Sequence, residues 1–468
     1  MLEFPFNRRR ALQLTAAAIT APVMLQPHQL DAEDDLPQLP RGVRIMHPRG
    51  RVPLSFIIDD STCLVNMGHF CMPQFAQAWP KREIYQQPWQ DWPREIPDSF
   101  VREFGTWCAQ QGVKGKYSIV PYPACVGWMD RQLPGWSKQD LDNSLALVRD
   151  LMMPNWDIHP EMITHTRVID LKTGRPMETA TAATMENSYP QTDISVDQLA
   201  EYLAYALRIL KNCGLQCEGI TTPGGFGNAV KDKLPLAVHQ AVRDVFASEL
   251  PHYFKYVKTG SESTDPKLEF IGGEKTISNL TMNVPAGTGD WFGSWEGVRE
   301  SEPDRYCNQD ATSGRMVELI ERDQPAIMLC HWPGMYCNGN KSGFEAFKQV
   351  VLAIQSRFAD RTRWMKLSEI GRYWAARKLT TIQRPTPHTI QFDAPLACPD
   401  FTVAIDQPTA SAPLRLEIGN DRLPLQSVQS KASLTTNSFA LADDKILVSF
   451  NLPQGISRMV VGTDSGKD

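Results

Sequence analysis

Two adjacent carboxylates, Asp59 and Asp60, directly follow the apolar run of residues 54–58. A short, continuous apolar run of this kind predicts a buried strand of a parallel sheet. In parallel α/β folds, catalytic and ligand-binding groups gather at the carboxyl ends of the strands. Two buried aspartates need a cation, a shared proton or strong donors nearby. The pair therefore predicts either a reactive site or two caps on the turn that follows.

Histidines follow later predicted strands in the same way. His159 and His165 come after the run of residues 155–158, and His331 ends the run of residues 325–330. Neutral imidazole is a frequent metal ligand, and aspartate oxygen completes many zinc sites. The chain has only nine histidines. Two of them six positions apart at a strand end favour a metal site over separate hydrogen-bonding roles.

The order of these groups along the chain resembles the polysaccharide deacetylase family, the nodulation-protein-B homology domain. The motifs that carry the resemblance are Asp59–Asp60, His159 with His165, the Thr-Thr-Pro-Gly-Gly turn at residues 221–225, Asp290–Trp291 and the Leu-Cys-His of residues 329–331. The resemblance covers residues 45–378. It implies a metal-dependent hydrolase that removes acetyl groups from a polysaccharide or oligosaccharide.

The resemblance also implies a role for each matched residue. Asp59 would be the catalytic base, and His331 would be the general acid, oriented by Asp290. The implied ligands of a divalent ion, which we expect to be zinc, are Asp60, His159 and His165. The residues expected to contact the substrate are Arg167, Pro223, Gly224, Trp291 and Trp332.

The chain departs from the family pattern at two motifs. Five residues separate His159 from His165, where the family usually has three. The turn at residues 221–225 lacks the family's arginine, and Arg167 is a candidate replacement for that charge. These differences indicate a divergent member, or a relative that has kept the barrel and changed the reaction.

Other interpretations of the same residues stay open. Cys63, His69 and Cys71 could form a second metal cluster, or His69 alone could be an extra ligand of the first. One aspartate of the Asp59–Asp60 pair together with Glu161 would suit a glycoside hydrolase that needs no metal. The twelve tryptophans could instead serve a glycan-binding protein without catalysis.

Alternating strand and helix patterns must position these groups. The predicted helix at residues 195–211 opens with the capping box Ser195 and Gln198 and ends at Gly214. Further helices are predicted at residues 343–358 and 368–376, and further strands at residues 115–120, 217–220 and 363–366. The alternation predicts a TIM-like (β/α) barrel with eight regular units or fewer. A doubly wound sheet is the alternative.

The pattern of apolar and polar residues changes near residue 379. Short alternating runs at residues 402–405, 414–418 and 446–450 predict a small β-sandwich. We therefore predict a catalytic barrel over residues 45–378 and a β-sandwich domain over residues 379–468. A linker at residues 31–44 would precede them.

The amino terminus predicts export. Residues 1–30 resemble a twin-arginine signal, with three arginines at residues 8–10 before an apolar, alanine-rich run. An amphipathic helix is the alternative. We expect a periplasmic or extracellular protein with no membrane span in the mature chain. The net charge of −5 argues against a nucleic-acid partner, so the expected partner is a carbohydrate substrate.

Overall fold

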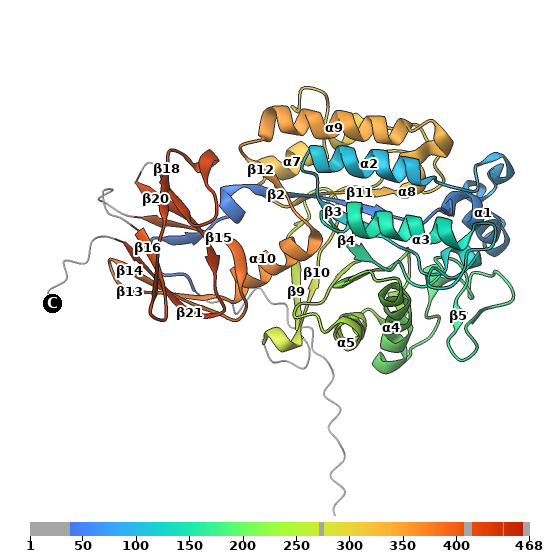
Figure 1. The fold of residues 1–468 in the computed structure, drawn as a ribbon, viewed down its shortest axis with the longest axis horizontal. Helices are drawn as coiled ribbons and strands as arrows, with labels where there is room; N and C mark the ends of the chain where they lie inside the picture. Colours follow the sequence, from blue (N-terminus) through green and yellow to red (C-terminus); the bar gives the residue numbers. More distant parts are fainter. Residues whose placement is uncertain (1–37, 271–275, 407–413, 443, 462–468) are drawn as a thin grey trace, which may run out of the picture.

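The computed structural model describes residues 38–270, 276–406, 414–442 and 444–461. The predicted export signal at residues 1–30 and linker residues 31–37 lie outside these ranges. Within the described ranges, no helix is both long and apolar enough to cross a membrane. Figure 1 shows a larger part in which helices surround strands, and a C-terminal part made of strands, with α10 (Leu367–Leu379) at their junction.

Parallel strands form the centre of the larger part, as the strand–helix alternation predicted. One sheet has the order β11-β2-β3-β4, with β12 also paired with β2, and a second has the order β7-β8-β10-β9. Only the β9–β10 pair among these is antiparallel. The bounds are β2 (Val52–Asp59), β3 (Gly115–Ser118), β4 (Trp156–His159), β7 (Gly219–Thr221), β8 (His252–Phe254), β9 (Lys267–Phe270), β10 (Leu280–Asn283), β11 (Ala326–His331) and β12 (Thr362–Trp364).

Single contacts join the edges of these two sheets. On one side, Glu161 after β4 forms an isolated parallel bridge with Thr221 of β7. On the other side, the N–H of Gly287, after β10, donates to the carbonyl of Ile327 in β11 at 2.8 Å. In the described part of the chain no continuous ladder runs from one sheet into the other. The parallel α/β architecture is therefore present, and a regular barrel stays a prediction.

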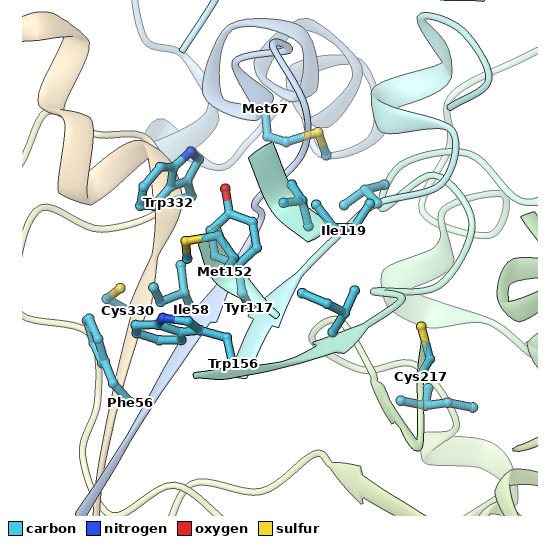
Figure 2. Close-up of a cluster of buried hydrophobic side chains, with 14 of the residues drawn as sticks. Phe56, Ile58, Met67, Tyr117, Ile119, Met152, Trp156, Cys217, Cys330 and Trp332 are labelled. Carbon is cyan, nitrogen blue, oxygen red and sulfur yellow. The ribbon is translucent and has the colours of Figure 1, made fainter. Parts of the chain in front are cut away.

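The strands direct one face toward the helices, because side chains alternate along a strand. Phe56 and Ile58 of β2, Tyr117 of β3 and Trp156 of β4 lie together in this core (Figure 2). Phe347 of α9 stacks on Phe56 with ring centroids 4.3 Å apart. The other helices are α1 (Met67–Ala78), α2 (Asp98–Gln110), α3 (Lys138–Leu147), α4 (Val196–Asn212), α5 (Leu234–Phe246), α6 (Pro303–Tyr306), α7 (Arg315–Glu321), α8 (Trp332–Tyr336) and α9 (Ser342–Phe358). The opposite face carries buried polar side chains such as Lys116 and His159 beside apolar ones such as Ile57.

The long predicted elements are confirmed. The helix predicted at residues 195–211 is α4, and Ser195 and Gln198 form the reciprocal capping box. The helices predicted at residues 343–358 and 368–376 are α9 and α10, and the strand at residues 325–330 is β11. The strands β8 and β10 were not predicted from the sequence, because they are only 3 and 4 residues long.

The predicted C-terminal sheet domain is present as two five-stranded sheets, of order β1-β15-β20-β19-β18 and β13-β14-β21-β16-β17. Phe392 of one sheet packs on Phe401 and Phe450 of the other, with ring centroids 6.3 and 5.2 Å apart. The strand β1 joins this domain although it precedes the α/β part. The bounds are β1 (Val43–Ile45), β13 (Thr381–Thr386), β14 (Thr389–Ala394), β15 (Cys398–Asp406), β16 (Leu414–Ile418), β17 (Asp421–Pro424), β18 (Gln426–Val428), β19 (Ser438–Ala442), β20 (Lys445–Leu452) and β21 (Gly455–Val461).

Candidate metal and catalytic site

The carboxyl ends of β2 and β11 bring Asp59 and His331 side by side. The two strands are parallel, and His331 is the register partner of Asp59. Partners in register project from the same face of a sheet. Asp59 is buried, whereas 25% of the His331 side chain is exposed. A carboxylate and an imidazole thus meet at the sheet edge where the sequence predicted the catalytic base and acid.

Asp290 holds His331, in the pairing that the sequence predicted. Its Oδ2 lies 2.7 Å from His331 Nδ1 and also accepts the backbone N–H of His331 at 3.2 Å. Burial opposes a positive charge on His331. The hydrogen bond to Asp290 and the charges of Asp60, Asp290 and Asp59 outweigh it and raise the pKa of His331 to about 10. The imidazole is therefore protonated at neutral pH.

Asp59 is paired with a cation that the sequence analysis did not anticipate. The fully buried Lys116 of β3 donates to Asp59 Oδ1, to Ser118 Oγ at 2.7 Å and to the carbonyl of Ile58 at 3.1 Å. Burial raises the pKa of Asp59, as does the nearby Glu161 carboxylate, whereas Lys116 lowers it; the net pKa is above its usual value. Lys116 therefore offsets part of the cost of keeping Asp59 ionised.

Asp60, Glu161 and His165 converge on one point next to Asp59. His165 Nε2 lies 2.7 Å from Asp60 Oδ1 and 3.3 Å from Glu161 Oε1. One ligand atom from each residue lies within 4.8 Å of the other two, and all three side chains are buried. Burial opposes a charge on His165, but the two carboxylates outweigh it and raise its pKa well above the ordinary value.

The donors of this cluster fit a divalent cation. Two carboxylates and one imidazole are ligands that zinc accepts. The buried Asp60 Oδ1 has no hydrogen bond of acceptable geometry within the described residues, although His165 Nε2 is only 2.7 Å away. The two atoms are close enough to be ligands of one ion. A dication would also balance the two buried carboxylates, with the imidazole neutral.

A buried carboxylate holds the loop that carries His165. Glu186 accepts the backbone N–H groups of Ile163, Thr164 and His165 at 3.2, 2.9 and 2.6 Å, and the hydroxyl of Tyr202 donates to it at 2.5 Å. His165 has a φ of 62°, which a non-glycine residue adopts only at a cost. The bonds to Glu186 stabilise this conformation and so fix the position of the imidazole.

His159 lies in a different group of side chains, so the expected ligand set of Asp60, His159 and His165 does not form. Its Nε2 is 2.9 Å from Nε2 of His252 on β8, and Asp157 completes that group. Burial lowers the pKa of both histidines, and that of His252 falls to about 4.

The end of β4 separates the two histidines. His159 is still a strand residue, paired in register with Ser118, so its side chain projects to the inner face of the sheet. Glu161 and His165 lie beyond the strand end, and the backbone N–H of Asp60 donates to Glu161 Oε2 at 2.7 Å. Glu161 therefore occupies the ligand position that the sequence analysis assigned to His159.

Two other predicted site residues lie in the core instead. Trp332, the first residue of α8, is fully buried and packs against aromatic side chains of α2, so it does not face the site. His69 of α1 is also buried, with Nδ1 3.0 Å from the carbonyl oxygen of Trp92. Cys63 and Cys71 do not join it in any group of the described residues that could hold a metal.

The remaining predicted substrate contacts lie at the same end of the sheets. Arg167 follows the His165 loop, and its guanidinium donates to Gln74 Oε1 at 3.0 Å and to two backbone carbonyls. Pro223 is buried and Gly224 exposed in the turn after β7, and Trp291 is half-buried. Their contact with a substrate stays a prediction.

Sequence reasoning missed three residues and gave a fourth a different role. Lys116 had a signal, since it is the one charge inside the apolar run of residues 115–120. Glu161 was considered only as an acid–base partner, although its spacing of four from His165 suits two ligands of one ion. Glu186 and His252 had no local signal, because their contacts depend on distant parts of the chain.

No family model matches the chain, and no curated protein matches it. Among solved structures, one similar chain is described as "a putative glycoside hydrolase/deacetylase" from Parabacteroides distasonis; it is 12% identical, has a TM-score of 0.38, and the match covers 76% of this chain and 81% of that one. Another is the catalytic domain of the GH30 xylanase C from Talaromyces cellulolyticus, at 8% identity, a TM-score of 0.24, and coverage of 79% and 93%. A third is an endo-β1,6-glucanase, at 9% identity, a TM-score of 0.25, and coverage of 91% and 92%. TM-scores this low support no inference about function. The function must therefore be inferred from the geometry of the site.

Proposed function

We propose that this protein is a metal-dependent hydrolase that removes acetyl groups from a polysaccharide or oligosaccharide. The observation that carries the proposal is the convergence of Asp60, Glu161 and His165 on one point, beside Asp59 and the protonated His331. A cation site flanked by a base and an acid is the arrangement that metal-assisted hydrolysis requires.

Asp60, Glu161 and His165 would hold the divalent cation, which we propose to be zinc. The cation would supply Lewis acidity and a water whose pKa is lowered from about 15.7 toward ~7.

Asp59 is the group placed to accept a proton from that water. Its carboxylate lies at the strand end beside Asp60 and is buried, which raises its proton affinity. The ion pair with Lys116 acts in the opposite direction, lowering that pKa and favouring the ionised form that a base requires. General bases of this kind contribute on the order of 10²–10⁴-fold to the rate.

His331 is the group placed to return a proton to the leaving sugar nitrogen or oxygen. Asp290 occupies its Nδ1, which leaves Nε2–H as the proton to deliver. A pKa of about 10 keeps the imidazole protonated at neutral pH. The 25% exposure of the side chain gives a substrate access to it.

Aromatic side chains border the cluster and support a saccharide as the substrate. The ring of Phe75 lies 6.1 Å from that of His165, and Trp295 lies 5.3 Å from Phe75. Tyr85 and Trp295 are half-buried, with ring centroids 5.7 Å apart. Aromatic faces with a few polar groups are typical of small-molecule sites, and the apolar face of a sugar ring can lie on such a surface.

We also propose that the chain is a divergent member of the polysaccharide deacetylase family, with its parallel strands arranged as a barrel and with export to the periplasm or cell exterior. The order Asp59–Asp60, His165, Asp290 and His331 along the chain supports this assignment. The joined sheet edges at Glu161 support the barrel.

Acetate release from a panel of N- and O-acetylated oligosaccharides tests the proposal. We expect zinc-loaded protein to release acetate, chelation to stop it and added zinc to restore it. His331→Gln should lower the rate by about 10²–10⁴-fold. Asp393→Asn, an exposed position on β14, is the control that should leave the rate unchanged. Zinc-loaded protein that releases no acetate from any of these sugars would contradict the proposal.

A metal-independent glycoside hydrolase is the second candidate, because two buried carboxylates, Asp60 and Glu161, lie together. Retaining glycosidases place such a pair ~5–5.5 Å apart with the sugar between. Here both carboxylates also contact His165, which leaves little space for a sugar. Release of reducing sugar that survives chelation would favour this candidate over the deacetylase.

A further inference from the structure

A second group of metal-ligand side chains lies deeper in the α/β part, on the inner faces of the sheets. It consists of Asp157 and His159 of β4 and His252 of β8. The Nε2 atoms of the two histidines are 2.9 Å apart, and Asp157 Oδ2 is 3.8 Å from His252 Nε2. One ligand atom from each of the three residues lies within 4.8 Å of the others.

Hydrogen bonds from neighbouring residues orient these ligands, as is usual around a metal site. Asp157 accepts the backbone N–H of Ser368 at 2.7 Å and its hydroxyl at 2.8 Å, at the start of α10. His159 Nδ1 is 3.3 Å from Thr221 Oγ1. The two imidazoles are fully buried and the carboxylate nearly so, at 12% exposure of its side chain.

The absence of a side chain at Gly219 is a second, independent observation that points to a ligand between the two histidines. A Cβ at this position would lie 2.5 Å from His159 Nε2 and 2.6 Å from His252 Nε2. The backbone of Gly219 has no positive φ, so its conformation does not require glycine. The absent side chain instead leaves the space into which both imidazole nitrogens point.

The position of the group suggests what a cation would do there. β4 belongs to the first sheet and β8 to the second, and among the described residues no continuous ladder joins these sheets at this edge. Three ligands from two sheets, one of them fastened to α10, would tie the sheet edges and a helix to one point. The surroundings are buried, so the site suits a structural role rather than contact with a substrate.

We propose that Asp157, His159 and His252 form a second site for a divalent transition metal, zinc by the nature of its ligands, which links the two parallel sheets. Two imidazoles and a carboxylate are a common zinc ligand set. The site is separate from the Asp60 cluster and does not depend on the proposed reaction. Without a metal, the two histidines would share a single N–H···N hydrogen bond, which is the alternative that an experiment must exclude.

Metal content of the full-length protein tests this proposal. We expect about two zinc equivalents in the wild type and about one in either His165→Asn or His252→Asn. His239→Asn is the matched control: this half-buried histidine of α5 contacts the carbonyl of Leu280, at 3.2 Å, and the hydroxyl of Thr281, and lies in neither group of ligands, so the variant should keep both equivalents. A His252→Asn variant that keeps the full zinc content of the wild type would overturn the proposal.

The His165→Asn variant keeps the test decisive if His252→Asn fails to fold, because it leaves the second group intact. X-ray absorption at the zinc edge should show two histidine ligands on the one zinc that remains. Gly219→Ala should remove that zinc when combined with His165→Asn, since the added Cβ fills the space between the imidazoles. A His165→Asn protein without zinc, or with zinc bound by fewer than two histidines, would contradict the second site.

Discussion

Lys116→Met removes the cation that pairs with the buried Asp59. The lysine is fully buried and its ammonium has three acceptors, so the methionine can fill the space but cannot replace the charge. Breaking a buried ion pair from one side typically costs about 3–5 kcal/mol, because the other charge stays buried without a partner. We expect a loss of that size in the free energy of unfolding at about pH 8.

The loss should depend on pH with a definite sign. The pKa of Asp59 is already above its usual value in the folded protein, and the loss of Lys116 raises it further. A carboxyl whose pKa is raised by folding is protonated more readily in the folded state, so it stabilises the fold at low pH and loses that contribution as the pH rises through the raised pKa. The deficit of Lys116→Met should therefore be smaller at about pH 5 than at about pH 8.

Urea unfolding followed by far-UV circular dichroism and by tryptophan fluorescence measures this effect. Lys114→Met is the matched control, since Lys114 pairs with Glu369 at 2.9 Å but is partly exposed; it should cost about 0–1 kcal/mol. Adding Asp59→Asn to Lys116→Met should recover much of the loss, because no buried charge then remains unpaired. A deficit equal at both pH values, or a double variant no more stable than Lys116→Met, would refute the reasoning.

Three further predictions concern the site. Asp59→Asn should abolish acetate release while metal analysis shows the zinc still bound; loss of both would make Asp59 a ligand instead of a base. Asp290→Asn removes the contact that raises the pKa of His331 to about 10, so the alkaline limb of the pH–rate profile should move to lower pH, and an unmoved limb would count against His331 as the acid. Glu186→Gln should weaken zinc binding at His165 by about 10–100-fold in a chelator competition, because it loosens the loop that carries His165. Unchanged affinity would show that Glu186 is not needed to position that loop.

The parts of the site that end a strand could be predicted from the sequence. Asp59, Asp60 and His331 each follow an apolar run, and the carboxyl ends of parallel strands meet at one edge, so local pattern and topology sufficed. His159 was placed with them because it also ends such a run. In the structure His159 is still a strand residue, in register with Ser118, and it contacts His252 of β8, whereas Glu161 and His165 lie beyond the strand end and reach Asp60.

The rest of the site depends on contacts that no local pattern encodes. His252 meets His159 from 93 residues away, out of a strand of only 3 residues. Glu186 holds His165 from 21 residues away, across the two-residue strands β5 (Ile169–Asp170) and β6 (Arg175–Pro176), which are too short to be recognised in the sequence. Lys116 could have been recognised as a charge in a buried strand, but its partner could be identified only once the register of β3 against β2 was known.

Anomalous diffraction at the zinc edge from crystals of the zinc-loaded protein tests the central claim most directly. The account predicts a peak about 2.0–2.2 Å from ligand atoms of Asp60, Glu161 and His165, with Asp59 and His331 on either side and His159 outside the coordination shell. No peak at that point, or a peak whose ligands include His159 in place of Glu161, would contradict it.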